Sequence, residues 1–350
     1  LIETFTGHTN VVRSIDYASL NGEQYLCSGS KDKTVCVWNV KTRQLLKCFQ
    51  GHSTRVYCAK FSPYHYYNHH RSVICSSSGD KIIRFWDFDI DKEFQTLNGH
   101  NKGIIPLQFS RFSGGRYLCS GSFDKKIRLW DVETSKSLHV FKGHENTVWC
   151  LDISSLQSNS NDKSNNVGVI GGNGYTICSG SNDKTIRIWD IETTKQFNVF
   201  KGHTDYVMSV KYGSNELLNT ILSGSHDKSV RLWDIRTSKQ THVFKEHTNA
   251  VYCVEYLPFR NNNINNILNS NVICSGSEDN TIRFWDIRIT RKFYEVKGDE
   301  EDRGIRCIEF VALKNGERNF NHFSKILSFF NQNETKVNIL CEIKKECSKF

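Results

Sequence analysis

The sequence predicts an all-β protein assembled from small, repeated sheets. Six segments end alike, with apolar and polar residues alternating up to a Trp, as in Thr185-Ile186-Arg187-Ile188-Trp189. The six Trp residues are 48, 44, 59, 44 and 52 positions apart, a spacing typical of repeat architectures. Alternation with a period of two residues indicates a half-buried strand. A polar turn such as Gly180-Ser181-Asn182-Asp183-Lys184 precedes each such strand.

Composition limits the class of protein further. The chain has 350 residues, of which 12% are aromatic and only 3 are Pro, so most of it is expected to fold. No apolar run approaches the roughly 18 residues that cross a bilayer, so no membrane span is expected. The net charge of +9 permits an acidic partner or RNA and requires neither.

The 13 cysteines contain no C-x-x-C pair, which argues against zinc ribbons and thioredoxin-type redox sites. Nine of them recur at matching places in the repeats. Buried free thiols in a reducing compartment explain this recurrence better than disulfides do. We therefore expect an intracellular protein, cytoplasmic or nuclear.

The repeats divide the chain into consecutive units. A Gly-His pair opens five units, Glu246-His247 opens the sixth, and a Ser-Gly-Ser-x-Asp turn or a near variant precedes each Trp. The units span about 7–50, 51–98, 99–142, 143–201, 202–245, 246–297 and 298–350, and a strand at 1–6 precedes them. One such sheet cannot bury both faces, so neighbouring sheets must stack.

These motifs resemble those of WD-repeat proteins, and the chain is similar to the beta subunits of heterotrimeric G proteins over about residues 1–290. The resemblance implies a single propeller over 1–350, with four-stranded antiparallel blades around a central channel. We expect seven blades, the seventh degenerate and closed by strand 1–6 as its outer strand. The N-terminal coiled-coil helix of those subunits is absent here, which argues against pairing with a gamma subunit.

The resemblance also implies a hydrogen-bonded set of His, Ser, Asp and Trp inside each blade. Such a set satisfies buried polar groups and fixes the turn. By motif position the sets are His8, Ser28, Asp32, Trp38; His52, Ser76, Asp80, Trp86; His100, Ser120, Asp124, Trp130; His144, Ser179, Asp183, Trp189; His203, Ser223, Asp227, Trp233; and His247, Ser275, Asp279, Trp285.

The seventh unit is degenerate. Gly298-Asp299 lacks the His, although the segment 304–310 matches 250–256. Lys325-Ile326-Leu327-Ser328 resembles a second strand, and 336–341 aligns with 281–286, with Leu340 in place of Trp and Cys341 in place of Asp. We interpret this unit as a seventh blade with a weak core. The alternative is a tail that is not native blade sequence.

Three insertions, at about 62–72, 155–175 and 257–271, lie between the first and second strands of their units. The latter two are rich in Asn and Ser, and polar tracts of this kind are expected as tolerated surface loops. His65, His69 and His70 form an H-x-x-x-H-H cluster in the first insertion, which we expect in a loop rather than on a helix. We therefore expect no metal there.

The family's partner face is the rim formed by the Gly-His loops and the Ser-x-Asp turns. By spacing, its exposed positions are the third and fifth residues after each His and the residue before each turn Asp. The degenerate unit offers Gly304 and Arg306. The candidate partner-binding residues in the other units, chosen as aromatic, basic or otherwise hot-spot types, are Arg13, Lys31, Arg55, Tyr57, Phe123, Trp149, Tyr206, Met208, His226, Tyr252 and Glu278.

These observations favour a non-catalytic scaffold that binds peptide or loop segments of other proteins, with apolar and acidic character, on this rim. No phosphate loop, G-x-S-x-G elbow or H-E-x-x-H motif is present, so no catalytic residue or cofactor is expected. We expect a monomeric ring within a complex. One alternative is the sensor or targeting part of a longer chain, since Leu1 opens on a strand without its own blade. Another is RNA binding through the basic residues and nearby aromatics, with steep salt dependence.

Overall fold

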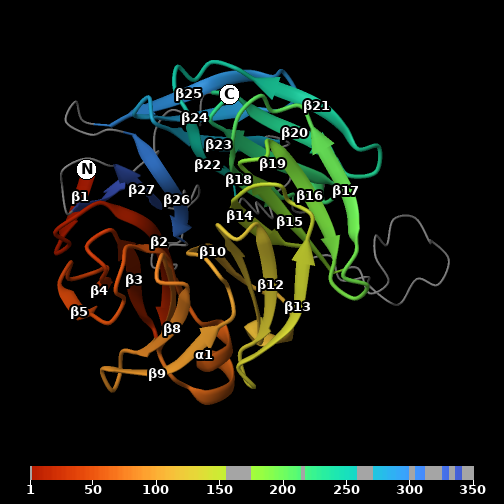
Figure 1. Cartoon of the computed structure of the whole chain (residues 1–350). Helices are drawn as coiled ribbons and strands as arrows, with labels where there is room; N and C mark the ends of the chain where they lie inside the picture. The colour runs from red at the N-terminus through yellow and green to blue at the C-terminus, as the bar shows by residue number, and fades with distance from the viewer. Residues whose placement is uncertain are drawn as a thin grey trace, which may run out of the picture.

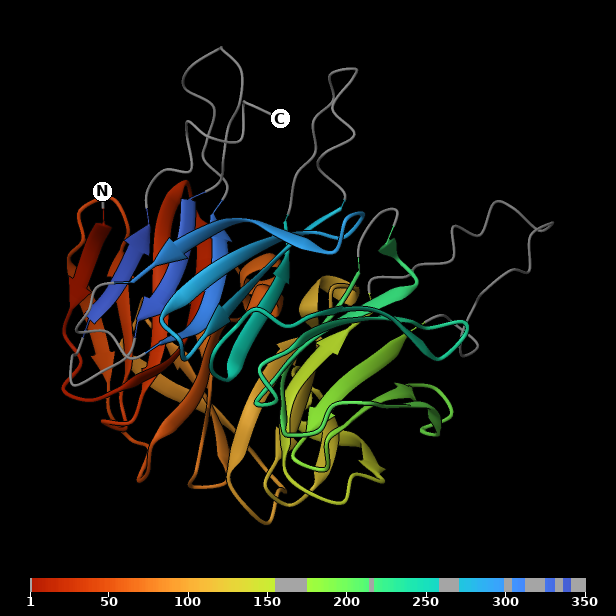
Figure 2. The same cartoon turned by 90° about the horizontal axis from the view of Figure 1, so that it is seen from above.

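In the computed structural model, four-stranded antiparallel sheets stand side by side around a common axis (Figures 1 and 2). The structure describes residues 2–154, 175–213, 217–257, 271–298, 304–311, 325–330 and 336–340. The inner strands contact one another in the order β2, β6, β10, β14, β18, β22, β26 and back to β2. None of the helices in the described ranges has the length and apolar character that a membrane span needs.

Six sheets, here called blades 1 to 6, each consist of four consecutive strands paired in chain order. Blade 1 comprises β2 (Val12–Leu20), β3 (Glu23–Ser30), β4 (Val35–Asn39) and β5 (Leu45–Phe49). Blade 2 comprises β6 (Val56–Phe61), β7 (Val73–Ser78), β8 (Ile82–Asp87) and β9 (Lys92–Asn98). Blade 3 comprises β10 (Ile104–Phe109), β11 (Tyr117–Ser122), β12 (Lys126–Asp131) and β13 (Lys136–Lys142).

The next three blades repeat this order. Blade 4 comprises β14 (Val148–Ile153), β15 (Thr176–Ser181), β16 (Thr185–Asp190) and β17 (Gln196–Lys201). Blade 5 comprises β18 (Val207–Tyr212), β19 (Thr220–Ser225), β20 (Val230–Asp234) and β21 (Lys239–Phe244). Blade 6 comprises β22 (Val251–Tyr256), β23 (Val272–Ser277), β24 (Thr281–Asp286) and β25 (Arg291–Lys297).

The remaining sheet, here called the closing sheet, joins both ends of the chain. Its strand order is β1 (Ile2–Thr6), β28 (Lys336–Leu340), β27 (Lys325–Phe330) and β26 (Ile305–Val311). β1 pairs antiparallel with β28, so the first strand of the chain lies beside its last strands (Figure 1). The prediction of an all-β propeller of four-stranded antiparallel blades is confirmed. Six sheets carry the full repeat and the closing sheet does not, so its role as a seventh blade stays a prediction.

Deleting residues 1–6 is expected to lower the thermal unfolding midpoint by several degrees. The deletion removes the outer strand that pairs with β28. It also removes Phe5, which is fully buried and packs edge to face on Trp38 with 6.4 Å between the ring centroids. Differential scanning calorimetry measures the effect, and Phe5→Ala separates the side-chain contribution from that of the backbone. An unchanged melt of the truncated chain would show that β1 does not stabilise the ring.

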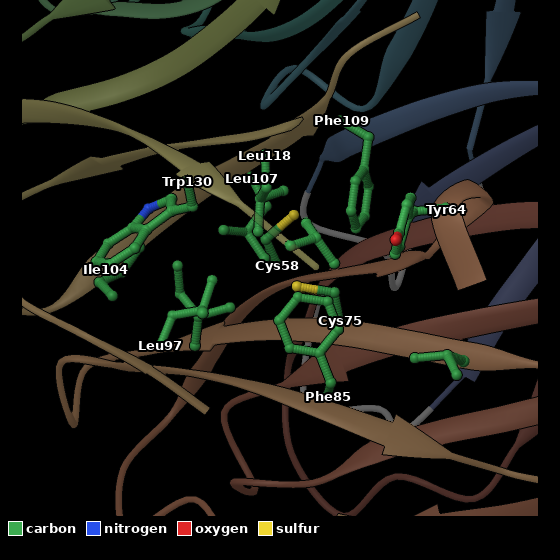
Figure 3. Close-up of a cluster of buried hydrophobic side chains, with 13 residues drawn as sticks. Cys58, Tyr64, Cys75, Phe85, Leu97, Ile104, Leu107, Phe109, Leu118 and Trp130 are labelled. Atoms are coloured by element: carbon green, nitrogen blue, oxygen red, sulfur yellow. The ribbon is translucent and has the colours of Figure 1, made fainter. Parts of the chain in front are cut away.

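Apolar side chains of neighbouring blades bury one another. Between blades 2 and 3, Cys75 and Phe85 pack against Ile104, Leu107 and Trp130, and Figure 3 shows these side chains pointing toward one another. Successive side chains of a strand point to opposite faces of its sheet, so every second residue of a blade faces the adjacent blade. The hydrophobic core is therefore distributed between the blades.

The nine cysteines that recur in the repeats are all free, and eight of them are buried. Burial raises the pKa of thiols such as Cys75 and Cys178, which suits inert core packing. One disulfide, Cys36–Cys48, was not foreseen. It joins opposed residues of β4 and β5, and neither cysteine belongs to the recurrent set.

The first insertion forms a short helix, α1 (Pro63–His69), so the prediction of a loop for the histidine cluster was wrong. Pro63 occupies the first turn of the helix, where its missing N–H costs no hydrogen bond. The helix buries the side chains of Tyr64 and His65. Packing of these two side chains fixes the helix, which seven residues could not sustain alone. A 3₁₀ turn, Ser113–Gly115, lies between β10 and β11. The structure describes only Tyr175 of the second insertion, and only Leu257 and Asn271 of the third. The rest of both insertions lies outside the described residues.

Candidate functional site

The predicted polar sets occupy the rim at which the Gly-His loops and Ser-x-Asp turns meet, here called the upper rim. In all six blades the His Nδ1 lies 2.7–2.8 Å from a turn Asp Oδ2, and the His Nε2 lies 2.6–2.9 Å from a strand Ser Oγ. In blades 2 to 6 the Trp Nε1–H donates to the same Ser Oγ at 2.8 Å. These bonds tie the loop, the turn and two strands together.

The distances fit one direction of proton donation. The Trp N–H donates to Ser, the Ser O–H donates to His Nε2, and the His Nδ1–H donates to Asp, which requires a neutral imidazole. Burial lowers the pKa of His203 and outweighs the opposing effect of Asp227. Burial would raise the pKa of Asp227, but the interactions with His203, Ser229 and the Thr204 N–H together outweigh burial, and the pKa falls well below its usual range.

Blade 1 departs from this pattern. Trp38 Nε1 is buried and has no hydrogen-bond partner, although His8 Nε2 still lies 2.6 Å from Ser28 Oγ. Cys36 stands where the other five blades carry an Arg. In blades 4 and 5 that Arg donates to the outer strand, as Arg187 does to Gln196 and Arg231 does to Gln240, both at 2.6 Å. In blade 1 the Cys36–Cys48 disulfide makes the corresponding link.

A β-bulge at the start of each inner strand aims one side chain at the inner edge of the upper rim. The register between the inner and second strands shifts at this point in all seven sheets. Bulges re-aim side chains in this way. In each inner strand, the side chain aimed in this way belongs to the residue that follows the first paired residue of the strand. These residues are Arg13, Tyr57, Ile105, Trp149, Met208, Tyr252 and Arg306.

Two runs of aromatic rings lie on the upper rim. On blades 2 to 4, Tyr57 packs against Phe123 at 5.7 Å between ring centroids, and Phe123 packs against Trp149 at 5.9 Å. On blades 5 and 6, Tyr206 contacts His226 at 5.7 Å, and His226 contacts Tyr252 at 5.6 Å.

Most of these rings are half-buried, and Tyr206 is 39% exposed. Six of the candidate residues, with Met208 beside them on the inner edge, therefore present an apolar surface that is only partly covered. The indole Nε1 of Trp149 has no hydrogen-bond partner.

Four cations lie between the two aromatic runs: Arg13, Lys31, Arg55 and Arg306. Burial, followed by repulsion from Arg306 and Arg55, lowers the pKa of Arg13 to about 10. Burial and the charges of the same three arginines lower the pKa of Lys31. No carboxylate of the described ranges forms an ion pair with any of the four. Arg306 covers the Tyr252 ring at 4.2 Å, and Glu278 lies beside the same tyrosine.

A shallow groove extends this basic surface along the rim of blades 2 to 4. Phe123, Gly103 and three lysines, Lys81, Lys102 and Lys125, are among the residues that line it. Lys81 and Lys125 follow the turn Asp of their blades and adopt φ of about 73° and 70°, which directs both outward. These three lysines were not among the predicted partner-binding residues, although their position after the turn Asp recurs in the sequence.

The sequence analysis also missed a set of polar residues that lies deeper along the axis. They occupy the eighth position after each His, with Glu309 at the aligned place of the closing sheet: Asp16, Lys60, Gln108, Asp152, Lys211, Glu255 and Glu309. Lys211 pairs with Glu255 at 2.6 Å, and Lys60 lies 3.6 Å from Asp16. Burial, then repulsion from Asp16, raises the pKa of Glu309 to about 7 against the opposing charges of Lys60 and Lys211.

The described residues offer no group of three or more His, Cys, Asp or Glu side chains placed to hold a metal ion. In the histidine cluster on α1, His65 Nδ1 lies 2.8 Å from Ser62 Oγ. Burial, followed by His69 and Arg71, lowers the pKa of His65 to about 4. His65 is therefore a core side chain of blade 2.

Fold and repeat geometry together define a propeller built from His–Asp–Ser–Trp repeats. The chain belongs to the WD40 family: the model of the WD domain, G-beta repeat, matches residues 1–39, 43–87, 91–131, 135–190, 194–234 and 238–286. Each match runs from the outer strand of one sheet through the three inner strands of the next, so consecutive repeats interlock. No match covers residues 287–350, which hold most of the closing sheet.

Curated relatives are similar over short segments. Superkiller complex protein 8 of Dictyostelium discoideum is 39% identical over 62 residues, and the peroxisomal targeting signal 2 receptor of Mus musculus is 36% identical over 63. WD repeat and SOCS box-containing protein 1 of Xenopus tropicalis is 41% identical over 64. Each alignment covers 18% of this chain and 15–20% of the relative. The aligned part therefore spans about a fifth or less of these proteins.

Proposed function

We propose that this chain is a non-catalytic interaction scaffold that binds peptide or loop segments of other proteins on its upper rim. The observation that carries the proposal is the pair of aromatic runs, Tyr57–Phe123–Trp149 and Tyr206–His226–Tyr252, held partly open on a rigid frame. Half-buried aromatic side chains lose little entropy on binding and are the residues most enriched at binding hot spots. The bulges hold Tyr57, Trp149 and Tyr252 in place before a partner arrives.

The family and the relatives support a binding role. A WD40 propeller is typical of proteins that hold other proteins together, and one relative is by name a receptor while another belongs to a complex. The polar sets, which offer paired His and Asp, serve the turns, since each set bonds within its own blade. We therefore assign them to structure rather than to catalysis.

Two further parts of the proposal concern the ring and its surroundings. The closing sheet acts as a seventh blade, because its inner strand β26 contacts both β22 and β2 and its outer edge is β1. The protein is a single ring. It works inside the cell, because its nine free cysteines suit a reducing compartment. The Cys36–Cys48 bridge is compatible with this if it forms within the folded blade.

Co-purification with mass spectrometry tests the scaffold role. The wild-type chain is compared with the Trp149→Ala/Tyr252→Ala variant, and we expect the variant to lose its partners because each anchor contributes about 2 kcal/mol or more. The matched control is Tyr67→Ala/Phe197→Ala, which removes two exposed aromatic rings elsewhere on the molecule. Thermal melts of all three chains establish that they fold.

Selective loss of partners in the first variant supports binding at the upper rim. Equal partner sets for wild type and both variants would reject the rim as the binding face. RNA recovered in place of protein, with steep salt dependence, would favour the nucleic-acid alternative.

A further inference from the structure

We propose that the four-cation cluster of Arg13, Lys31, Arg55 and Arg306 is a phosphate subsite, so that the partner segment carries a phosphorylated side chain. The proposal rests on the upper rim being the binding face and names the chemistry that this face selects. The cations come from three adjacent sheets: the closing sheet, blade 1 and blade 2. Arg13 and Arg306 follow the bulges of the neighbouring inner strands β2 and β26, so the ring brings these two side chains to the same part of the rim.

The cluster lacks the counter-charge that structural cations normally have. Elsewhere on the blades, cations pair with carboxylates, as Lys211 does with Glu255 at 2.6 Å and Arg116 with Asp131 at 2.8 Å. Within the described ranges Arg13, Lys31, Arg55 and Arg306 have no ion pair, and the Nε atoms of Arg13 and Arg306 are buried without a hydrogen-bond partner. Mutual repulsion of these charges destabilises the free protein. An anion would relieve this repulsion.

Geometry favours a phosphate over a carboxylate. A carboxylate is planar and carries one charge, and it satisfies one guanidinium fork. A phosphate ester carries between one and a half and two charges near pH 7 and has three acceptor oxygens, so donors from several directions can reach it. Burial together with Arg306 and Arg55 lowers the pKa of Arg13 to about 10, which agrees with a site that is short of negative charge.

The surroundings favour a peptide over a nucleic acid. Nucleic-acid surfaces present aromatic faces on which bases stack. Here the rings of Tyr57, Phe123 and Trp149 pack edge to face, at interplanar angles of 67° and 78°. The guanidinium of Arg306 already covers the Tyr252 ring. Apolar side chains flanking a phosphorylated residue fit this surface, and Lys81, Lys102 and Lys125 suit further acidic residues along the segment.

An array of degenerate peptides with a central phosphoserine or phosphothreonine tests the proposal, using the full chain. The same peptides with serine or threonine, and with glutamate, are measured beside them, together with poly(U) RNA. We expect phosphorylation to strengthen binding about tenfold or more, with glutamate intermediate. We expect Lys31→Gln/Arg55→Gln to lose about tenfold or more of that binding.

The control is Lys184→Gln/Lys228→Gln, which removes the same charge from exposed turn positions of blades 4 and 5. We expect it to change binding less than twofold. An equal loss in this variant would show that only net charge matters and would overturn the subsite. Equal binding of phosphorylated and plain peptides, no binding of the phosphorylated ones, or tighter binding of poly(U), would overturn it as well. If plain peptides bind and need Trp149 and Tyr252 but not Lys31 and Arg55, the rim function stands and the phosphate assignment fails.

Discussion

Replacing Trp233 by Ala should destabilise the protein by about 3–5 kcal/mol. The indole is 1% exposed, its ring lies 5.7 Å from those of Phe200 and His203, and its N–H donates to Ser223 at 2.8 Å. The variant opens a cavity between blades 4 and 5 and leaves the Ser223 hydroxyl with one partner fewer. Chemical denaturation followed by circular dichroism measures the loss.

Two comparisons isolate the causes of this loss. Phe197→Ala removes an aromatic ring that is 49% exposed, and we expect it to cost less than about 1 kcal/mol. Trp233→Phe and Trp38→Phe remove the same atoms, but only Trp233 donates a hydrogen bond, because Trp38 Nε1 has no partner. We therefore expect Trp233→Phe to cost about 1 kcal/mol more than Trp38→Phe. Equal costs would show that the indole–serine bond adds nothing to stability.

Acid should unfold the protein steeply below about pH 4. Hydrogen bonds from His hold the pKa of the six turn aspartates below the usual value of 3.8 in the folded state, and for Asp124 the pKa is about 2. A carboxyl with a lowered folded pKa stabilises the protein above its unfolded pKa, and this stability is lost as the pH falls through the folded pKa. At about 1 kcal/mol or more for each aspartate, the melting midpoint should fall by about 10 °C or more between pH 5 and pH 2.5.

The Asp227→Asn variant tests whether the turn aspartates cause this loss. It should be less stable at neutral pH and should lose less stability on acidification, since one titrating group is gone. Asp91→Asn is the control, because Asp91 is 57% exposed and pairs only with the partly exposed Lys47. An unchanged acid slope in Asp227→Asn would assign acid unfolding to other carboxyls.

Two other kinds of side chain change the stability of the protein between pH 4.5 and 7, in opposite directions. The lowered pKa values of His144, His203 and His247, caused first by burial, mean that the unfolded chain takes up protons first, so stability falls as the pH drops below 6.5. Glu309, with its pKa raised to about 7, stabilises the folded state as the pH falls toward 4.5. The Glu309→Gln background therefore reveals the histidine contribution alone.

The repeat made the polar sets predictable down to single residues, because His, Ser, Asp and Trp recur at fixed offsets. The same reasoning could not foresee the open Trp38 N–H or the Cys36–Cys48 bridge, since blade 1 carries Cys where the recurrent residue is Arg. α1 was missed because seven residues show no helical period. Packing of Tyr64 and His65 against blade 2 decides its structure.

Spacing predicted the rim residues and placed three of the four cations together, but it did not group Arg306 with them. Arg13, Lys31 and Arg55 come from two units that are neighbours in the chain, whereas Arg306 reaches the same place only because the ring brings β26 beside β2. Its repulsion with Arg13 depends on that closure. The axial set, which includes Asp16, Lys60 and Glu309, could not be predicted from residue type, because the position changes between acidic, basic and amide residues from unit to unit. Its place in the sequence, the eighth position after each His, identifies most of the set.

The antiparallel pairing of β1 with β28 has a mechanical consequence. Ile2, at the start of β1, lies opposite Leu340, at the end of β28, and Thr6 lies opposite Lys336. The start of β1 and the end of β28 are therefore neighbours in the closing sheet. Tension applied at Ile2 and Leu340 would load the strand pair one hydrogen bond at a time, as a zipper is opened, instead of loading all of its bonds in shear. A pull between attachments at these two points would therefore part β1 from β28 at low force while blades 1 to 6 remained folded.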